Sequence, residues 1–318
     1  AAEAAEDTEK NETDEVVIAT PRDAVQGSGD AYYCWEGAYV WEALTANNGG
    51  VIDPWLAKSW EHNDDCTEWT FNLRDDAYFT DGVQFDADVC LKNIERWGHG
   101  ITSTYTTLSI EKSLPNLDKM EKVDDFTVKF TFTQPITTLE YVLSDYGSPM
   151  YSPNCFDEET GVISDYAIGT GPYKITDHVE SEYVTLERND NYYGENGKVK
   201  TFKIRCIPDA ETRVSALKSG EVLGLADNGA ITMDAAKNLC DTDSNFEMDS
   251  TPSHMTEYIM FNDKNEYLAD KRMREAFNLA TDRDSICSVI YGGLLQPAYS
   301  FLSTQSIFHL DIQGTYDM

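Results

Sequence analysis

Residues 68–97 of this chain are EWTFNLRDDAYFTDGVQFDADVCLKNIERW, and they predict a strand, a turn and a helix in that order. The strand follows from the alternation of apolar and polar residues, which places Trp69, Phe71 and Leu73 on one face. The dipeptide Asp81-Gly82 then predicts a turn, because glycine adopts backbone conformations that other residues avoid.

The helix in the second half of this stretch is predicted from its cap and its apolar face. Asp86 stands where a side-chain oxygen can accept from an orphan amide of the first turn. Cys90, Ile94 and Trp97 recur at helical spacing and predict a buried stripe.

Comparable patterns extend in both directions along the chain. Apolar runs or alternation predict strands at 16–19, 126–132, 183–186, 202–206 and 258–261. Helical spacing predicts helices at 31–44, 210–218, 270–280 and 282–291. Gly169-Thr170-Gly171-Pro172 predicts a turn leading into a strand, since Pro172 lacks the amide that a phosphate loop would need. Strands and helices mix without strict alternation, which indicates an α/β fold in the broad sense.

Composition narrows the function classes. The chain has 318 residues, enough for two domains, and 41% of them are hydrophobic, enough for buried cores. Its 24 Lys and Arg against 57 Asp and Glu give a net charge of −33. That balance excludes nucleic acid as a principal partner and disfavours docking on an anionic membrane. No apolar run approaches the roughly 18 residues of a membrane span.

The first fifteen residues, AAEAAEDTEKNETDE, contain seven acids, one lysine and no large apolar residue. Such a segment cannot bury a core, so residues 1–15 are expected to form a disordered acidic tether.

Catalytic and metal-binding motifs do not emerge from the sequence. The seven cysteines are scattered without a CxxC pair, which favours mostly free thiols and leaves room for one or two disulfides. The five histidines form no HExxH motif, and neither GxSxG nor GxxxxGK[ST] occurs, so no catalytic residue, metal site or cofactor is predicted. Acid pairs such as Asp64-Asp65 and Asp75-Asp76 leave a carbohydrate-active enzyme as a remote alternative, although a solvated face explains them better.

Aromatic residues in predicted loops stand above this background. Tyr32, Tyr33 and Trp35 follow a glycine-containing loop after the first strand. Tyr105, Tyr146 and Tyr151 fall in other predicted loops. Loop aromatics behind strand ends are typical walls of a ligand cleft, and ordinary aromatic packing is the competing interpretation.

Several blocks together resemble one family, the family 5 extracellular solute-binding proteins, which are peptide- and nickel-binding receptors of ABC importers. The first blocks are Pro54–Glu61, Trp69–Asp75, Phe79–Gly82 and Phe85–Val89. The next are Gly169–Tyr173, Leu186–Asn189 and Tyr192–Gly194, and the last are Phe261-Asn262, Arg272–Phe277 and Ala280–Arg283. The resemblance runs from about residue 16 to residue 303.

The resemblance implies an α/β fold of the type II periplasmic-binding-protein kind, with two lobes, an inserted subdomain and an incomplete second lobe. It places lobe I at 16–51 and 169–253, the inserted subdomain at 52–168, and the start of lobe II at 254–318. Family members continue beyond this chain's end, and the acid that recognises a peptide's amino terminus lies in that part. The cleft is therefore expected to be incomplete here, with poor packing after Gly293 and low affinity.

The resemblance also implies a function: an extracytoplasmic receptor that captures peptides and delivers them to ABC transporter permease subunits, without enzymatic activity. A receptor for a nickel chelate or another small solute is the alternative. Nickel receptors use an arginine in the segment matching 146–151, which here is Tyr-Gly-Ser-Pro-Met-Tyr, and this favours peptide. By position, the ligand-binding residues are Gly29, Asp30, Ala31, Tyr32, Tyr105, Tyr146, Gly147 and Ser148. The protein would be a cell-surface lipoprotein, held at the cytoplasmic membrane only by a lipid anchor outside this sequence.

Overall fold

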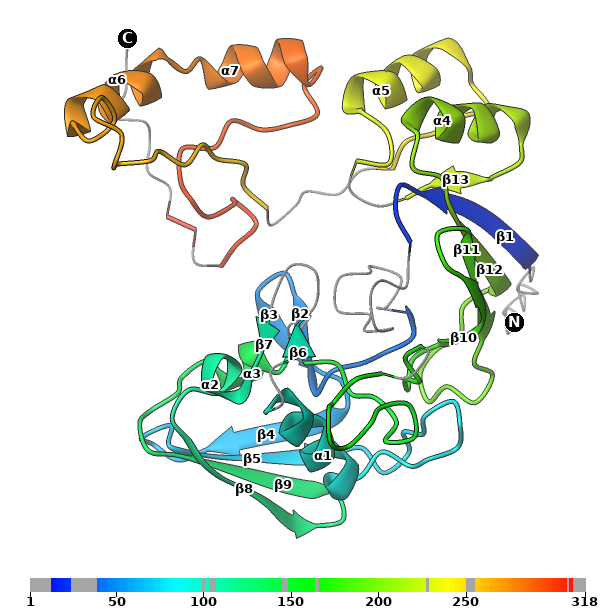
Figure 1. Cartoon of the computed structure of the whole chain (residues 1–318), viewed down its shortest axis with the longest axis vertical. Coiled ribbons are helices and arrows are strands. Elements are labelled where there is room, and N and C mark those ends of the chain that lie inside the picture. The colour runs from blue at the N-terminus through cyan, green and yellow to red at the C-terminus, as the bar shows by residue number, and fades with distance from the viewer. Residues whose placement is uncertain are drawn as a thin grey trace, which may run out of the picture. The chain divides into compact units, whose positions relative to one another are not determined.

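The computed structural model describes residues 13–23, 39–98, 101–102, 107–144, 148–163, 166–226, 229–249, 255–307 and 309–310. The chain divides into two compact units. Figure 1 shows the course of the chain and labels its helices and strands. Unit 1 comprises Ala1–Asn47 and Ile52–Ala230, and unit 2 comprises Asn48–Val51 and Ile231–Met318.

Unit 1 contains a five-stranded sheet in the order β10-β11-β12-β1-β13. Its strands are β1 (Thr13–Thr20), β10 (Tyr173–Val179), β11 (Tyr183–Arg188), β12 (Val199–Cys206) and β13 (Gly224–Leu225). β1 runs parallel to β12 and β13, whereas β10, β11 and β12 pair antiparallel. Helix α4 (Ala210–Ser219) connects β12 to β13; Asp209 caps its start, and Gly220 ends it at a φ of 77°. The predicted strands at 16–19, 183–186 and 202–206 and the helix at 210–218 are thus confirmed.

The first strand begins earlier than the sequence predicts. β1 starts at Thr13 rather than Val16, so residues 13–15 of the predicted tether belong to the sheet. Backbone pairing with β12 needs no apolar side chain, and Lys200 forms a 2.9 Å ion pair with Asp14. Residues 1–12 lie outside the described residues.

Unit 1 also contains a four-stranded antiparallel sheet in the order β4-β5-β9-β8. Its strands are β4 (Ala57–His62), β5 (Glu68–Leu73), β8 (Leu117–Asp124) and β9 (Thr127–Phe132). Helix α1 (Ala87–Trp97) contacts β8 and β9, and Asp86 caps it by accepting from the Val89 amide at 2.9 Å. This confirms the strand, turn and capped helix that residues 68–97 predict.

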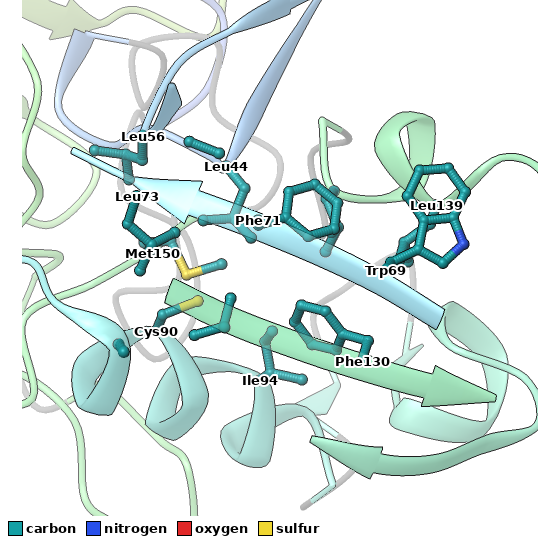
Figure 2. Packing of buried hydrophobic residues seen from close by; sticks show 14 of the residues in the cluster. Leu44, Leu56, Trp69, Phe71, Leu73, Cys90, Ile94, Phe130, Leu139 and Met150 are labelled. Carbon is teal, nitrogen blue, oxygen red and sulfur yellow. The ribbon is translucent and has the colours of Figure 1, made fainter. Parts of the chain in front are cut away.

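Between this helix and sheet lies the largest apolar core of the described residues (Figure 2). Phe71, Ile94 and Phe130 are fully buried in it. Each such side chain contributes roughly 1.5–3 kcal/mol when removed from water. The shorter elements are β2 (Thr45–Asn48), β3 (Val51–Pro54), β6 (Ile101–Thr102), β7 (Thr107–Leu108), α2 (Ile110–Ser113) and α3 (Leu139–Val142). They belong to unit 1, except that the last residue of β2 and the first residue of β3 are part of unit 2.

The helix predicted over 31–44 is wrong in its described part. Residues 40–44 are not helical, because their carbonyls accept from amides of other chain segments instead of from their own next turn. Apolar spacing alone cannot distinguish a helix from an irregular segment that is buried on several sides.

Unit 2 contains α5 (Met233–Thr242), α6 (Lys271–Ala280), α7 (Arg283–Ser285) and the π-helical turn η3 (Ile286–Ile290). Asp270 and Asp282 cap α6 and α7, at the starts of the two predicted helices. The strand predicted at 258–261 is wrong: no described strand pairs with it, and Ile259 and Met260 are 78% and 81% exposed. Phe301 and Leu310 are also largely exposed. Of the helices described, none has both the length and the hydropathy of a membrane span.

Candidate functional site

The predicted ligand-binding residues lie mostly in parts of the chain that the structure does not describe. These are Gly29, Asp30, Ala31, Tyr32, Tyr105, Tyr146 and Gly147. Ser148 is described and is 1% exposed, so its side chain is buried. Tyr151, another predicted loop aromatic, belongs to an apolar cluster with Trp41 and Phe156 and is a core residue.

Residues 40–44, which follow the first predicted pocket segment, contribute to three different cores. Val40 packs in the core of the five-stranded sheet. Trp41 joins the cluster around Tyr151, and Leu44 joins the core of the four-stranded sheet. One short segment therefore ties these parts of unit 1 together.

Backbone hydrogen bonds to residues 40–44 come from three other segments. The Met150 amide donates to the Glu42 carbonyl at 2.8 Å, and the Gly171 amide donates to the Val40 carbonyl at 2.9 Å. Leu56 and Ala57, where β4 begins, donate to the carbonyls of Ala43 and Leu44 at 3.2 and 2.8 Å. Met150 lies two residues after Ser148, where the predicted 146–148 segment ends, so this hydrogen bond holds the chain just beyond that segment to residues 40–44.

Two glycines allow the turn before β10 to approach this segment. A Cβ atom on Gly169 would lie 1.9 Å from the Val40 carbonyl oxygen, and one on Gly171 would lie 2.6 Å from the Tyr39 carbonyl oxygen. Both distances are far inside van der Waals contact, so only glycine fits at these two positions. The prediction that this turn leads into a strand is confirmed, since β10 begins at Tyr173.

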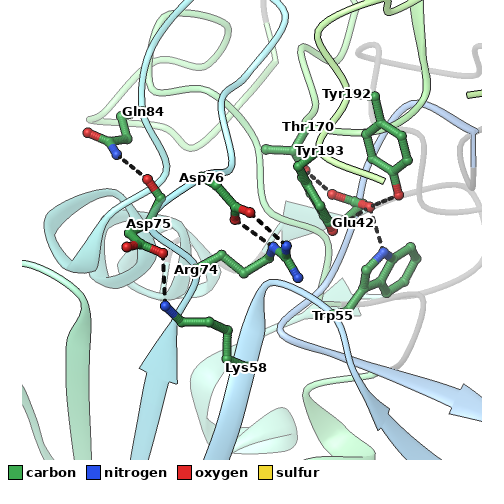
Figure 3. A network of polar contacts seen from close by, with 10 residues as sticks. All are labelled: Glu42, Trp55, Lys58, Arg74, Asp75, Asp76, Gln84, Thr170, Tyr192 and Tyr193. Atoms are coloured by element: carbon green, nitrogen blue, oxygen red, sulfur yellow. Dashed lines mark hydrogen bonds and ion pairs between the residues drawn. The ribbon is translucent and has the colours of Figure 1, made fainter. Parts of the chain in front are cut away.

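A network of polar side chains surrounds the Glu42 carboxylate (Figure 3). Glu42 is fully buried and accepts four side-chain hydrogen bonds. Its Oε1 accepts from Trp55 Nε1 at 2.6 Å, from the Tyr192 hydroxyl at 2.7 Å and from the Tyr193 hydroxyl at 2.8 Å. Its Oε2 accepts from the Thr170 hydroxyl at 2.7 Å. Full burial and these four donors leave the carboxylate without contact to solvent, so it serves as a structural hydrogen-bond acceptor.

Burial dominates the electrostatics of this cluster. It raises the pKa of Glu42, and the four hydrogen bonds lower that pKa only in part. Burial, followed by the nearby Glu42 charge, raises the pKa values of the Tyr192 and Tyr193 hydroxyls, which stay protonated donors. The Arg74 guanidinium lies 4.0 Å from the centre of the Tyr193 ring and is paired with Asp76 at 2.8 Å.

Other acidic and thiol side chains of the described residues are either ion-paired or unreactive. Asp75 and Asp76 are exposed and paired with Lys58 and Arg74, which agrees with a solvated face. Burial raises the pKa of the Cys155 thiol to about 11 and that of Cys90 further, so neither is a ready nucleophile. Within the described ranges, no cluster of three or more His, Cys, Asp or Glu side chains could hold a metal ion.

The Glu42 cluster is not among the sites that the sequence predicts. One signal could have pointed to it: Glu42 is the only charged residue in the run Gly37–Thr45, GAYVWEALT. A lone acid inside an apolar run is expensive to bury and needs several hydrogen-bond donors. Its partners come from positions up to 151 residues away, so the sequence could not have identified them.

Comparison with known proteins agrees with the resemblance seen in the sequence. The profile of the bacterial extracellular solute-binding proteins, family 5 Middle, matches residues 51–317. The glutathione-binding protein GsiB of Escherichia coli K12 is 28% identical over 244 residues, which are 76% of this chain and 46% of that protein. The chain thus spans about half the length of the relatives it matches.

Solved structures show the same fold. NikZ from Campylobacter jejuni in complex with Ni(L-His) superposes with a TM-score of 0.71 at 26% identity, over 88% of this chain and 55% of that one. DppA from Helicobacter pylori in complex with the peptide STSA superposes with a TM-score of 0.72 at 23% identity, over 89% and 59%. The predicted α/β periplasmic-binding-protein fold is confirmed, and the chain belongs to the family 5 bacterial extracellular solute-binding proteins.

Proposed function

We propose that this protein is an extracytoplasmic receptor that captures peptides and delivers them to the permease subunits of an ABC importer. The observation that carries the proposal is the family match over residues 51–317. The relatives point towards peptides: GsiB is named for glutathione, which is a tripeptide, and the DppA structure holds a tetrapeptide. The receptor acts by binding and release, without chemical turnover.

The ligand site of this proposal consists of the positions that the sequence singles out. Gly29, Asp30, Ala31 and Tyr32 come from lobe I, and Tyr105 comes from the inserted subdomain. The hydrogen bond from Met150, two residues after Ser148, to Glu42, ten residues after Tyr32, is consistent with a third segment, residues 146–148, near the first. Backbone groups would hold the main chain of a peptide while aromatic walls accept varied side chains.

The domain assignment remains part of the proposal. Lobe I would comprise 16–51 and 169–253, the subdomain 52–168, and lobe II would start at 254. The separate cores of the two sheets in unit 1 support a subdomain distinct from lobe I. A lipid anchor would hold the receptor at the outer face of the cytoplasmic membrane, with an acidic segment as tether.

A nickel chelate is the second candidate ligand. The observation in its favour is the likeness to NikZ with Ni(L-His), at an identity similar to that of GsiB. A chelate brings its own metal donors, so such a receptor recognises the organic ligand and need not supply a metal-binding cluster.

Isothermal titration calorimetry distinguishes these ligands, on this chain and on the longest natural form of the protein. The probes are glutathione, the peptide Ser-Thr-Ser-Ala and nickel with excess L-histidine. Saturable heat with a peptide supports the proposal, and Tyr32→Ala and Tyr105→Ala should weaken it with little change in melting temperature. The exposed Tyr258→Ala serves as the control. Binding heat with the nickel complex but with neither peptide would mean that the ligand is a nickel chelate instead of a peptide. Chemical turnover of any probe would mean that the protein is not purely a receptor.

A further inference from the structure

Glu42 lies outside both sheets of unit 1, but its chain neighbours and its hydrogen-bond donors connect it to the regions of both. Val40 packs in the core of the five-stranded sheet, and Leu44 packs in the core of the four-stranded sheet. We infer that Glu42 is a positioning residue that holds the four-stranded sheet against the five-stranded sheet. Its importance for ligand capture rests on the proposed function, because the proposed ligand residues come from the chain regions of both sheets.

We call residues 40–44 and the segments that donate hydrogen bonds to them the joint between the two sheets. The four donors to the Glu42 carboxylate come from both sides of this joint. Trp55 lies just before β4 of the four-stranded sheet. Thr170 lies in the turn before β10, and Tyr192 and Tyr193 lie between β11 and β12, so these three belong to loops that adjoin the five-stranded sheet. A single carboxylate therefore joins side chains that no backbone ladder connects directly.

Tyr193 crosses the joint in a second way. It follows β11, yet its ring packs against the core of the four-stranded sheet. The Arg74 guanidinium, directly after β5, covers that ring at 4.0 Å. A cation over an aromatic face is attracted by the ring's electrons. The hydroxyl bond to Glu42 and the contact with Arg74 thus fix the same ring from two sheets.

The chemistry of the site favours a carboxylate over other acceptors. All four donors are neutral, so the buried charge is stabilised by hydrogen bonds, which are stronger when the acceptor is ionised. A glutamine could keep three donors on its oxygen and donate from its amide nitrogen to the Thr170 hydroxyl, which can reverse. An alanine would leave four buried donors without an acceptor. Contacts across the joint should be strongest with Glu at position 42, weaker with Gln and weakest with Ala.

Site-resolved hydrogen exchange tests this inference at the amides that donate into residues 40–44, namely Leu56, Ala57, Met150 and Gly171. Glu42→Ala should speed exchange of these joint amides at least tenfold, and Glu42→Gln should speed it less. Amides within the β5–β9 and β11–β12 pairs should change less than twofold. An equal change at all amides would mean that Glu42 supports overall stability only, and the inference would be wrong.

A matched pair of tyrosine variants covers the case in which Glu42→Ala does not fold. Tyr193→Phe removes only the hydroxyl that donates to Glu42. Tyr173→Phe removes a hydroxyl that donates to the Val199 carbonyl at 2.7 Å, inside the five-stranded sheet. The first should speed exchange of the joint amides about threefold or more, and the second should leave them unchanged. Equal effects of the two variants on the joint amides would overturn the inference.

Calorimetry with Ser-Thr-Ser-Ala and glutathione separates this inference from the proposed function. If the unmodified protein binds a probe, Tyr193→Phe should weaken the affinity about threefold or more, and Tyr173→Phe should not. Binding by the unmodified protein with no loss in Tyr193→Phe would overturn the link between Glu42 and ligand capture while the receptor function stands. Binding of neither probe, together with the expected exchange at the joint, would overturn the peptide-receptor function and leave the positioning role supported.

Discussion

The Tyr193 hydroxyl donates a 2.8 Å hydrogen bond to the carboxylate of Glu42, a residue 151 positions earlier in the chain. The same carboxylate oxygen accepts from Trp55 and Tyr192, and its partner oxygen accepts from Thr170. A buried acid that is satisfied in this way is stable only in one arrangement of its neighbours. The consequences can be measured separately from ligand binding.

Glu42 should make stability depend on pH. Burial raises its pKa in the folded protein above the ordinary value of 4.5, which the unfolded chain retains. Between these two pKa values the folded state binds more protons than the unfolded state, so this group's contribution to stability falls as the pH rises. Below pH 4.5 the contribution is complete and no longer changes.

Glu42→Gln removes this titration. In urea denaturation at a series of pH values, the unfolding free energy of the variant relative to the unmodified protein should increase as the pH rises above about 4.5. Both proteins contain the other carboxylates, so the contributions of those groups cancel in the difference between the two unfolding free energies. A difference that stays constant from pH 4 to pH 8 would show that Glu42 has no raised pKa.

Gly169→Ala should be strongly destabilising. The new Cβ would lie 1.9 Å from the Val40 carbonyl oxygen, and the backbone would have to move to relieve the clash. A cost of about 3 kcal/mol or more is expected, at the upper end of overpacking effects. Gly224→Ala is the control, because its Cβ would meet only the Ile18 side chain at 3.4 Å. Similar urea midpoints for the two variants would contradict the close approach at Gly169.

Asp86→Ala should destabilise α1. Its carboxylate accepts from the Val89 amide at 2.9 Å, and loss of such a cap costs typically about 1 kcal/mol. Asp88→Ala, two residues further along in the first turn of the same helix, removes an exposed ion pair with Lys122 and should cost about 0.5 kcal/mol or less. The two unfolding free energies measured under one condition decide this, and a larger loss at Asp88 would contradict the assigned cap.

Thiol reactivity should separate buried from partly exposed cysteines. Burial raises the pKa of Cys155 to about 11 from an ordinary 9.0, so its thiolate at pH 8 should be about a hundredfold scarcer. Alkylation followed by mass spectrometry should modify Cys240 and Cys287 well before Cys90 and Cys155. Denaturation should abolish the difference. Early modification of Cys90 in the folded protein would contradict its full burial in the core.

The net charge of −33 should make the fold more stable in salt. Repulsion among like charges is screened as the Debye length shrinks from about 10 Å at 0.1 M to about 3 Å at 1 M. The ion pairs of the described residues are mostly exposed and lose little by comparison. The urea midpoint should therefore rise between 0.05 and 0.5 M sodium chloride. A falling midpoint would mean that ion pairs outweigh the repulsion.

Local pattern in the sequence determined several of the longer helices and strands. The alternation at Trp69, Phe71 and Leu73 specifies one buried strand face, and Asp86 and Gly220 specify helix ends by their own backbone and side-chain chemistry. These features depend on interactions within a few residues, so the local sequence is sufficient to predict them. Blocks such as Trp69–Asp75 and Gly169–Tyr173 also sufficed to indicate the family, which the profile match confirms.

Tertiary structure alone decided the fate of residues 40–44, 258–261 and Glu42. The first segment has helical spacing but gives its carbonyls to distant amides, and the second has strand-like residues but no described strand beside it. A strand or a buried acid exists only if partners far along the chain supply hydrogen bonds, and Glu42 finds its own at Trp55, Thr170, Tyr192 and Tyr193. Which distant groups meet is set by the packing of whole sheets, and no local pattern of residues encodes it.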